Sequence, residues 1–534
     1  MRRWNGWGDD TLDYPLNESA LAFLTARIGA STPTRDASLA QVLTAIPDSR
    51  LGQAGAFDVT PETRLRHARG QSFPDWLALR SGRIGPVPDA VAFPESHDDV
   101  AQILGAARQR GATVIPYGGG TSVVGHLNVP PGERPVLSLD LGRLNRLMQL
   151  DPISRLARFG AGVAGPDLEA QLRAQGYVLG HLPQSFEYST LGGWVVTRSS
   201  GQQSLKYGRI ENLFAGGRML TPAGALDIPS IPASSAGPDL REWVMGSEGR
   251  FGVLTEAQVR VTPLSQCEGF HAVFFPSWEQ GCSAVREIAQ ARLPLSMLRL
   301  SNAIETETQL ALAGHPNLIA WLQRYLGWRG VGAGKNKAQC MLLIGITGDR
   351  RLYRYAKGAA LSIARQQQGV HVGRFIGKGW SKNRFRGPYL RNTLWEAGYA
   401  ADTIETSVDW PKVTSLMQAM EKTAREAFAA CNERVHAFTH LSHVYPQGSS
   451  IYSSFVFRVC QDPDEMMARW RRLKTRVSEQ IVAHGGTISH QHGVGVDHAP
   501  YLAAEKTELG LAAIRSVAKH FDPDGMMNPG KLFQ

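Results

Sequence analysis

The chain has 534 residues, a formal net charge of +10, 43% hydrophobic residues and 19% charged residues. This composition is typical of a folded protein with two to four domains, and it excludes an intrinsically disordered chain. The basic residues are dispersed, and the sequence contains no recognisable DNA- or RNA-binding motif. We therefore expect anionic small molecules or a lipid headgroup surface as partners, and no nucleic acid.

The pattern of cysteines and the search for targeting signals in the sequence indicate the cellular compartment of the protein. The five cysteines are odd in number and scattered, and none has C-x-x-C spacing, which favours reduced thiols over disulfides or a zinc site. No apolar run reaches the ~18–20 residues that span a bilayer, and the first ten residues lack the apolar core of a secretory signal. The sequence predicts a cytoplasmic protein and leaves open a peripheral position at the inner face of the membrane.

The first half of the chain predicts a mostly helical N-terminal region followed by a mixed α+β domain, with boundaries at residues 1–88 and 89–265. Spacing of apolar residues predicts a helix over 98–110. A second helix is expected from residue 165, with Asp167 as its cap, and a strand-like turn is expected at 207–213. The predicted strands lie at 90–94, 112–116 and 136–141.

The second half predicts an antiparallel sheet covered by helices, over residues 266–488, and a C-terminal segment over 489–534. The predicted strands lie at 271–276, 341–348 and 451–458. The predicted helices lie at 278–291, 350–368 and 463–483.

Three stretches rich in glycine and small hydroxyl residues indicate a ligand site. In the first, a strand leads into Gly118–Ser122, where successive backbone amides can form a nest for a pyrophosphate. The second, Leu182–Gly201, combines glycines with hydroxyls that suit a polyphosphate or the edge of a flavin ring. The third is S-E-G-R-F-G-V-L, over Ser247–Leu254. Each one alone also fits an ordinary surface loop, and none is a Walker A or Rossmann motif.

Together these stretches resemble the FAD-binding proteins of the vanillyl-alcohol oxidase (PCMH) type. Within that superfamily the chain is most similar to the alkyldihydroxyacetonephosphate synthase family. The motifs that carry this resemblance are Trp4–Trp7, Phe385–Arg391, Glu405–Trp410, Ser442–Tyr452, Ser489–Gly495 and Asp522–Leu532. The resemblance implies an α+β fold: a PCMH-type FAD-binding domain of two subdomains, an antiparallel-sheet cap domain, and mostly helical terminal segments, of which the C-terminal one returns to the flavin.

The resemblance also implies non-covalent FAD. A covalent link through His126 is disfavoured, because the attachment histidine of the superfamily directly follows the glycines, where this chain has Thr121. The cofactor-binding residues implied are Pro116, Tyr117, Gly118, Gly119, Gly120, Thr121, Ser122, Gln184, Ser185, Phe186, Glu187, Tyr188, Ser189, Thr190, Thr197, Arg198, Ser199, Ser200, Glu248, Gly249, Arg250, Phe251, Gly252, Val253 and Leu254.

The reaction that the resemblance implies exchanges the acyl group of acyl-dihydroxyacetone phosphate for a fatty alcohol, with the glycerone carbon held on flavin N5 and no net redox change. The catalytic residues implied are Tyr452, His490, His492 and Arg299. Arg391 is implied to bind the substrate through paired guanidinium donors. Because tyrosine is a weak base, we expect cations near Tyr452 that lower its pKa.

Structural roles remain as alternatives for several of these residues. Tyr452 could be an ordinary strand tyrosine, and Arg299 could form a buried salt bridge. Arg384 and Arg386 fit a solvated face better than the site, although either could assist a phosphate. At position 491 the family has the middle histidine of three, whereas this chain has Gln491, which cannot change charge near neutral pH.

Two other functions compete with the synthase. One is an FAD-dependent 2-hydroxy-acid dehydrogenase, whose metal ligands would fall at positions that hold Tyr452 and Gln491 here, so we predict no metal site. The other is a non-catalytic flavin-binding protein. For the lipid-like substrate, Leu318–Arg329 is expected either at a bilayer interface or as a packed cap helix. A homodimer is left open.

Overall fold

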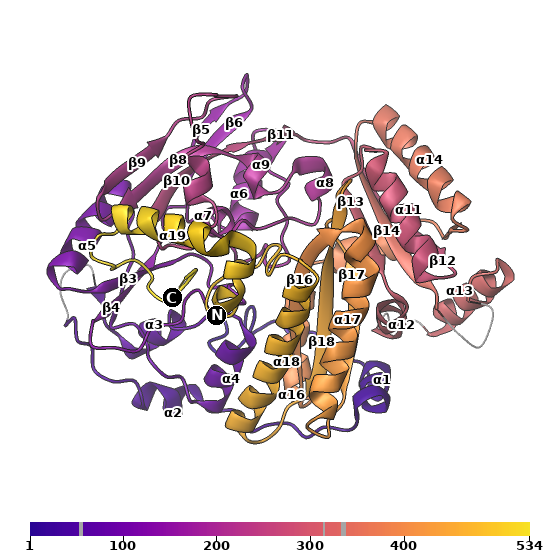
Figure 1. Cartoon of the computed structure of the whole chain (residues 1–534), viewed down its shortest axis with the longest axis horizontal. Helices are drawn as coiled ribbons and strands as arrows, with labels where there is room; N and C mark the ends of the chain where they lie inside the picture. Colours follow the sequence, from indigo (N-terminus) through magenta and orange to yellow (C-terminus); the bar gives the residue numbers. More distant parts are fainter. Residues whose placement is uncertain (53–56, 313–315, 333–337, 534) are drawn as a thin grey trace.

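The computed structural model describes residues 1–52, 57–312, 316–332 and 338–533. Figure 1 shows two halves side by side. The half built from the earlier part of the chain holds the predicted FAD-binding domain and is named the flavin-binding half, and the cap half is built mostly from residues after 266. The last helix returns to the first half, so both chain ends lie there (Figure 1). The parts predicted as 1–88 and 266–488 each contain a few residues outside the described ranges, and the part 489–534 contains one, residue 534.

In the described part of the N-terminal region the regular elements are mostly helices, and irregular chain makes up most of its length. Its elements are α1 (Glu18–Ile28), α2 (Leu39–Thr44), β1 (Phe57–Asp58), α3 (Pro61–Arg66) and α4 (Phe73–Ser81). Capping boxes at Ser38 and Ser72 satisfy the first free amides of α2 and α4. This region spans both halves, because β1 pairs with β2 of the flavin-binding half while α4 packs against α18 of the cap.

The flavin-binding half contains two sheets. In the first, of order β1-β2-β4-β3, strands β2, β4 and β3 are parallel, and helix α5 begins at a capping box formed by Ser96 and Asp99. The second sheet is antiparallel, of order β5-β6-β10-β8-β9, and a short ladder joins β7 to β11. The strands are β2 (Ala90–Ala92), β3 (Thr113–Tyr117), β4 (Val136–Asp140), β5 (Leu147–Asp151), β6 (Leu156–Gly160), β7 (Tyr177–Val178), β8 (Phe214–Thr221), β9 (Gly224–Ile228), β10 (Val253–Arg260) and β11 (Thr262–Pro263). The helices are α5 (His97–Gln109), α6 (Gly165–Arg173), α7 (Leu191–Thr197), α8 (Ser204–Tyr207), α9 (Ile210–Leu213) and α10 (Arg241–Val244).

The cap half is organised on one seven-stranded antiparallel sheet, of order β15-β12-β14-β13-β17-β18-β16. Its strands are β12 (Cys267–Phe275), β13 (Met297–Ser301), β14 (Cys340–Gly348), β15 (Val370–His371), β16 (Tyr399–Asp409), β17 (Val435–Leu441) and β18 (Gly448–Arg458). Its helices are α11 (Trp278–Gln290), α12 (Ala303–Leu312), α13 (Pro316–Trp328), α14 (Arg350–Gln366), α15 (Phe375–Asn383), α16 (Gly387–Glu396), α17 (Trp410–Ala429) and α18 (Pro463–Ala483).

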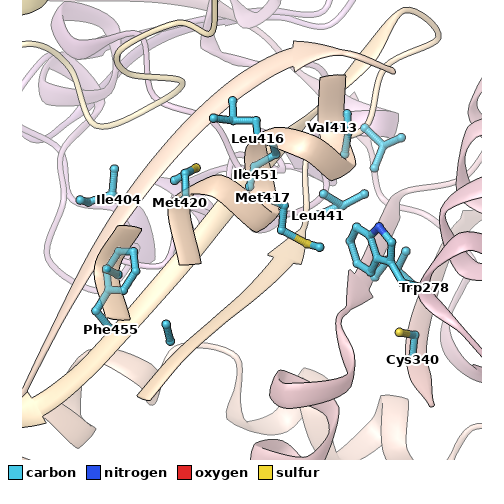
Figure 2. Packing of buried hydrophobic residues seen from close by; sticks show 14 of the residues in the cluster. Trp278, Cys340, Ile404, Val413, Leu416, Met417, Met420, Leu441, Ile451 and Phe455 are labelled. Atoms are coloured by element: carbon cyan, nitrogen blue, oxygen red, sulfur yellow. The ribbon is translucent and has the colours of Figure 1, made fainter. Parts of the chain in front are cut away.

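The two faces of this sheet have different roles, because successive strand residues point to opposite faces. One face carries Ile404, Leu441, Ile451 and Phe455 and forms the main hydrophobic core with α11, α14, α17 and α18. Figure 2 shows Leu416, Met417 and Met420 of α17 against these strand residues. The alternate residues of the same strands face the flavin-binding half.

The C-terminal segment consists of a short 3-10 turn at Ala499–Tyr501, helix α19 (Ala503–Phe521) and a tail. The tail runs beside β3: Met527 forms a parallel bridge with Val114, and the amide of Asn528 donates to the Val114 carbonyl. These contacts hold residues near the end of the chain against the strand that leads into the glycine-rich turn.

Two local expectations were wrong. Residues 207–213 form the end of α8 and the helical turn α9, in which the Asn212 side chain accepts from the Arg209 amide at 3.2 Å, and the strand begins only at Phe214. Asp167 lies in the first turn of α6 without a side-chain cap bond, and the N-cap residue is Ala164. The predicted fold class is confirmed: an α+β protein with an antiparallel-sheet cap.

Candidate active site

The glycine-rich turn directly follows β3. Backbone amides of Gly118–Ser122 have no hydrogen-bond acceptor among the described residues, so they remain available to a ligand. A side chain at Gly119 would overlap the Tyr188 carbonyl, and one at Gly118 would overlap the Thr190 hydroxyl. The turn is therefore held between β3 and residues 188–190 by contacts that only glycine permits, with its free donors facing a cavity.

The Leu182–Gly201 stretch contains a short helix, α7, that the sequence analysis missed. Its hydroxyls are largely engaged within the protein. Thr190 caps α7, Ser189 accepts from the Trp194 indole at 2.7 Å, and Thr197 donates to the Gly193 carbonyl at 2.8 Å. Ser199 and Ser200 bond to His181 and His443. These groups thus shape the wall of the site, and each hydroxyl keeps some capacity for a ligand.

Glu248 joins the third motif to the C-terminal segment. Its buried carboxylate accepts from the amides of Val494 and Gly495, and its own carbonyl accepts from Asn528. His126 lies 3.0 Å from the Glu248 carboxylate through Nε2 and 2.7 Å from the Ser122 hydroxyl through Nδ1. Both ring nitrogens of His126 therefore face protein partners, which argues against its use as a covalent flavin attachment point.

A cavity of about 1910 Å³ lies between the glycine-rich turn and the exposed face of the cap sheet. It is larger than the roughly 300–1,000 Å³ typical of a single small-ligand pocket. Most predicted cofactor residues line it, and so do Arg299, Arg391, Tyr452 and His492. The predicted residues that do not line it are Phe186, Glu187, Tyr188, Arg198, Arg250, Phe251, Val253 and His490.

The residues outside the cavity wall support it from behind. Phe186 stacks on Phe385 with ring centroids 5.1 Å apart, and Tyr188 packs edge-on against Trp7. Arg198 forms ion pairs with Glu211 and Glu242. Arg250 donates to the Met527 carbonyl. Phe251 and Val253 are buried in apolar clusters.

Tyr452 lies on β18 between two histidines. Its ring stacks on His440 at a centroid distance of 4.8 Å, and His492 packs edge-on at 6.0 Å. Burial raises the pKa of Tyr452 to about 12, and the charges of Glu405 and Asp402 act in the same direction, whereas Arg391 opposes them. The predicted nearby cation is therefore present, but Arg391 does not offset the loss of water around the phenol, so the pKa is raised and not lowered.

Arg299 and Arg391, two of the arginines that line the cavity, are in different states. Arg299 is paired: its guanidinium donates to Glu305 at 2.6 Å and lies 3.1 Å from His440. Burial opposes ionisation of Glu305, but Arg299 and His440 still lower its pKa to about 2. Arg391 donates to the Gln71 carbonyl and packs 4.3 Å from the Trp76 ring, with no carboxylate partner among the described residues. Arg391 thus has guanidinium donors left for an anion.

His490 lies behind the cavity wall. Its Nε2 meets the Arg209 guanidinium at 2.6 Å and the Tyr445 hydroxyl at 2.7 Å, and burial lowers its pKa well below the usual range. Its neighbour Gln491 reaches the cavity and donates to Glu405 at 3.0 Å. Of the S-H-Q-H residues, Gln491 and His492 therefore face the ligand space, and His490 positions them.

Three further polar residues belong to the cavity wall: His440 and His443, which were not predicted as site residues, and Arg384, for which a solvated face was preferred to a role at a phosphate. His440 and His443 line it from β17 and the loop that follows, and Arg384 does so from the end of α15 rather than from a solvated face. One Arg384 nitrogen is buried and without a hydrogen-bond partner in the described part of the chain, and burial lowers the pKa of this side chain. The period-two spacing of His436, Phe438 and His440 was the available signal, since such residues share one strand face.

The free amides of the glycine-rich turn, the glycines that hold it and the size of the cavity fit a bound dinucleotide cofactor. Comparison with known families agrees. A model described as "FAD binding domain" matches residues 88–227, and one described as "FAD linked oxidases, C-terminal domain" matches residues 266–532.

The chain is 32% identical to an alkyldihydroxyacetonephosphate synthase of Dictyostelium discoideum, over 88% of this chain and 77% of that protein. The corresponding protein of Trypanosoma brucei brucei is 31% identical over the same shares. The chain belongs to the alkyldihydroxyacetonephosphate synthase family. A solved alkyldihydroxyacetonephosphate synthase structure superposes with a TM-score of 0.85 at 26% identity, covering 99% of this chain and 98% of that one. The predicted family and FAD cofactor are confirmed, and the protein is an FAD-dependent enzyme of the alkyldihydroxyacetonephosphate synthase family.

Among residues 1–52, 57–312, 316–332 and 338–533, no helix has the length and apolar character needed to cross a membrane. No group of three or more His, Cys, Asp and Glu side chains in those residues is placed to hold a metal ion.

Proposed function

We propose that this enzyme exchanges the acyl group of acyl-dihydroxyacetone phosphate for a fatty alcohol, with release of a fatty acid. The observation that carries the proposal is that Arg391, Tyr452 and His492 meet at one cavity that also has a long apolar lining. An anionic headgroup and an aliphatic chain on the same molecule require this combination of charge and apolar surface.

At the polar end of the cavity, separate residues bind the anionic group of the substrate, accept a proton and donate a proton. Arg391 binds the anionic group of the substrate through its free guanidinium donors. Burial lowers the pKa of His492, so this imidazole is neutral at neutral pH and accepts a proton. Tyr452, a neutral phenol, donates one. Arg299, fixed by Glu305, holds His440 against the Tyr452 ring.

FAD, when bound at the glycine-rich turn without a covalent link, supplies the transient acceptor for the glycerone carbon between loss of the acyl group and arrival of the alcohol. The protein's own contribution is to bind the two substrates in turn, keep water away from the carbon and move protons at His492 and Tyr452.

The apolar end of the cavity accommodates the aliphatic chains. Its lining comes from six elements: α1, α12, α13, α15 and the far parts of β17 and β18. The apolar side chains in this lining include Phe23, Leu24, Leu310, Leu322, Ile376, Trp380, Phe438 and Val456. A saturated chain buried here is stabilised by about 0.8 kcal/mol per methylene group, so long-chain substrates should bind far more tightly than short ones.

In a direct test, the holoenzyme is incubated with acyl-dihydroxyacetone phosphate and with a fatty alcohol whose hydroxyl oxygen is ¹⁸O. The proposal predicts release of one fatty acid for each alkyl chain transferred, with the label retained in the ether product. Release of fatty acid without any ether, or no release at all, would contradict it.

We also propose that the mouth of the apolar end touches a membrane surface. Trp321 and Trp328 of α13 are 63% and 80% exposed, and Phe375 at the start of α15 is 65% exposed. Trp321 and Phe375 also line the cavity. Exposed aromatic residues beside arginines are suited to a bilayer interface.

The membrane proposal predicts that replacing both Trp321 and Trp328 by alanine weakens flotation with anionic liposomes at least several-fold. Leu509→Ala serves as a control, because Leu509 is 82% exposed on α19, on the flavin-binding half. If the wild type, the double tryptophan variant and Leu509→Ala float equally well with the liposomes, the proposal of membrane contact is wrong.

A further inference from the structure

His440 on β17 is a second histidine beside Tyr452, and its two ring nitrogens have different surroundings. Nδ1 lies 3.0 Å from Oε1 of Glu305, a side chain that is only 3% exposed. Nε2 has no hydrogen-bond partner in the described part of the chain, yet it is not enclosed by protein atoms, and His440 lines the cavity. This imidazole therefore presents Nε2 to the molecule that the cavity holds.

The contact with Glu305 determines which nitrogen of His440 carries the proton. Burial opposes ionisation of Glu305, but Arg299 and His440 lower its pKa to about 2, so its carboxylate is ionised and can only accept. Two unprotonated atoms 3.0 Å apart would repel, so the proton lies on Nδ1 and is donated to Glu305. Arg299 donates to the same carboxylate oxygen at 2.6 Å and needs no acceptor on His440. Nε2 consequently carries the lone pair that faces the cavity.

The same surroundings allow Nε2 to accept a proton at neutral pH. Burial lowers the pKa of His440, and the charge of Arg299 acts in the same direction, so the ring is neutral before the reaction. Glu305 opposes both effects, and its carboxylate stabilises the imidazolium that forms when Nε2 takes a proton. A carboxylate that orients a histidine and stabilises its charged form makes that histidine a general base.

The place of His440 along the cavity relates it to the aliphatic chain of a substrate. Phe438 and His440 are two residues apart on β17, both line the cavity, and they pair with Ser454 and Tyr452 of β18. Phe438 belongs to the apolar end, and His440 lies about 6.5 Å further along the strand, towards the polar end. A chain that runs along Phe438 and Val456 therefore ends with its terminal group beside His440.

We propose that His440 is a further catalytic residue, the base whose Nε2 takes the hydroxyl proton of the incoming fatty alcohol. This inference rests on the proposed function, which supplies the alcohol. The O–H bond breaks as the alcohol oxygen bonds to the glycerone carbon, and the electron pair that held this carbon returns to its transient acceptor. The proton passes from His440 to solvent, which balances release of the fatty acid as a carboxylate, so no oxidant or reductant is needed. His492 remains the base for the step that precedes arrival of the alcohol.

The two halves of the reaction test His440 separately. Fatty-acid release is measured in a single turnover with acyl-dihydroxyacetone phosphate alone, and ether formation is measured after fatty alcohol is added. His440→Phe keeps a ring against Tyr452, and His440→Asn keeps an amide donor for Glu305, but both lack the nitrogen at the cavity. His520→Asn is the control, since His520 is exposed on α19. Flavin absorbance and melting temperature show which variants are folded, and one folded His440 variant is enough for the test.

Both His440 variants should release fatty acid at nearly the wild-type rate and form the ether about 10²–10⁴-fold more slowly, the effect of losing a general base. An alcohol with two fluorine atoms on the carbon next to its CH₂OH group has a more acidic hydroxyl and depends less on a base. This alcohol should therefore reduce the defect of the variants. His520→Asn should carry out both steps as the wild type does.

Ether formation at the wild-type rate by either folded His440 variant overturns the proposal. An equal loss of fatty-acid release, or a defect that the fluorinated alcohol does not reduce, also overturns it and leaves His440 as a positioning residue for Tyr452. A wild-type enzyme that releases no fatty acid contradicts the proposed function, and with it the alcohol that this inference requires.

Discussion

Burial determines what the titratable side chains of the cavity can do. Tyr452 is a phenol whose pKa is raised to about 12, and His492 is an imidazole whose pKa is lowered by the same loss of water. Neither side chain changes its protonation near neutral pH, although both can exchange protons with a substrate. The two lie edge to face, with ring centroids 6.0 Å apart, so a proton accepted by one and a proton donated by the other can act on the same ligand.

Replacing Tyr452 by phenylalanine tests its role as proton donor. The ring stacking on His440 should survive, so Tyr452→Phe should keep FAD and its melting temperature and lower fatty-acid release by about 10²-fold or more. Tyr355→Phe is the control, since Tyr355 is 62% exposed on α14. A fully active Tyr452→Phe enzyme would exclude the phenol from the chemistry.

The pH dependence of turnover follows from the same shifts. A base with a lowered pKa stays functional as the pH falls below about 6.5, the value of an unperturbed histidine, and is lost only as the pH passes its own lower pKa. An acid with a raised pKa stays functional until the pH approaches about 12. We therefore predict a nearly constant kcat between about pH 6.5 and 9. A sharp bell centred in that interval would show that other groups control the rate.

Among the elements, the glycine-rich turn is the most constrained. Gly119→Ala should displace the turn from residues 188–190, because the added Cβ overlaps the Tyr188 backbone carbonyl, which cannot move aside cheaply. We expect the variant to lose most of its bound FAD, measured as the ratio of flavin to protein absorbance. Gly105→Ala is the matched control: Gly105 lies inside α5, where a Cβ meets nothing within 4 Å, and the change should stabilise that helix by roughly 1 kcal/mol. Equal FAD content in the two variants would mean that the turn does not hold the cofactor.

Elements with a regular pattern could be predicted from the sequence, and elements defined by partners could not. The apolar spacing of α5, α14 and α18 and the apolar strands β14 and β18 were predicted because burial imposes a period on them. Helix α7 was hidden, because its sequence L-G-G-W-V-V-T is poor in helix formers and depends on the Thr190 cap.

The residues of the candidate site also fall into two groups, those that the sequence could predict and those that depend on contacts made only in the fold. The resemblance placed Tyr452, His492, Arg299 and Arg391 at positions that the structure brings to one cavity. It also placed His490 there, but the contacts of His490 with Arg209 and Tyr445 come from residues 281 and 45 positions away and could not be read from a motif. The same holds for the neutral state of Tyr452, which depends on how completely the fold excludes water.

At the scale of the whole molecule, the cavity exists because two halves of the chain close on each other. The flavin-binding half supplies backbone donors, and the cap half supplies Arg299 and Tyr452 from its sheet and Arg391 from α16. The C-terminal segment supplies His492, and its tail binds β3 and Glu248. The N-terminal region links both halves. A homodimer remains a prediction, as does a cytoplasmic location.

The central claim is that this cavity performs acyl-for-alkyl exchange. The most direct measurement is the anaerobic absorbance spectrum of the purified flavoprotein with each substrate added separately. The account predicts bleaching of the flavin by acyl-dihydroxyacetone phosphate with release of one fatty acid, and recovery of the spectrum when a fatty alcohol is added. Bleaching by a simple 2-hydroxy acid, reversed only by an electron acceptor, would contradict the account and identify a dehydrogenase.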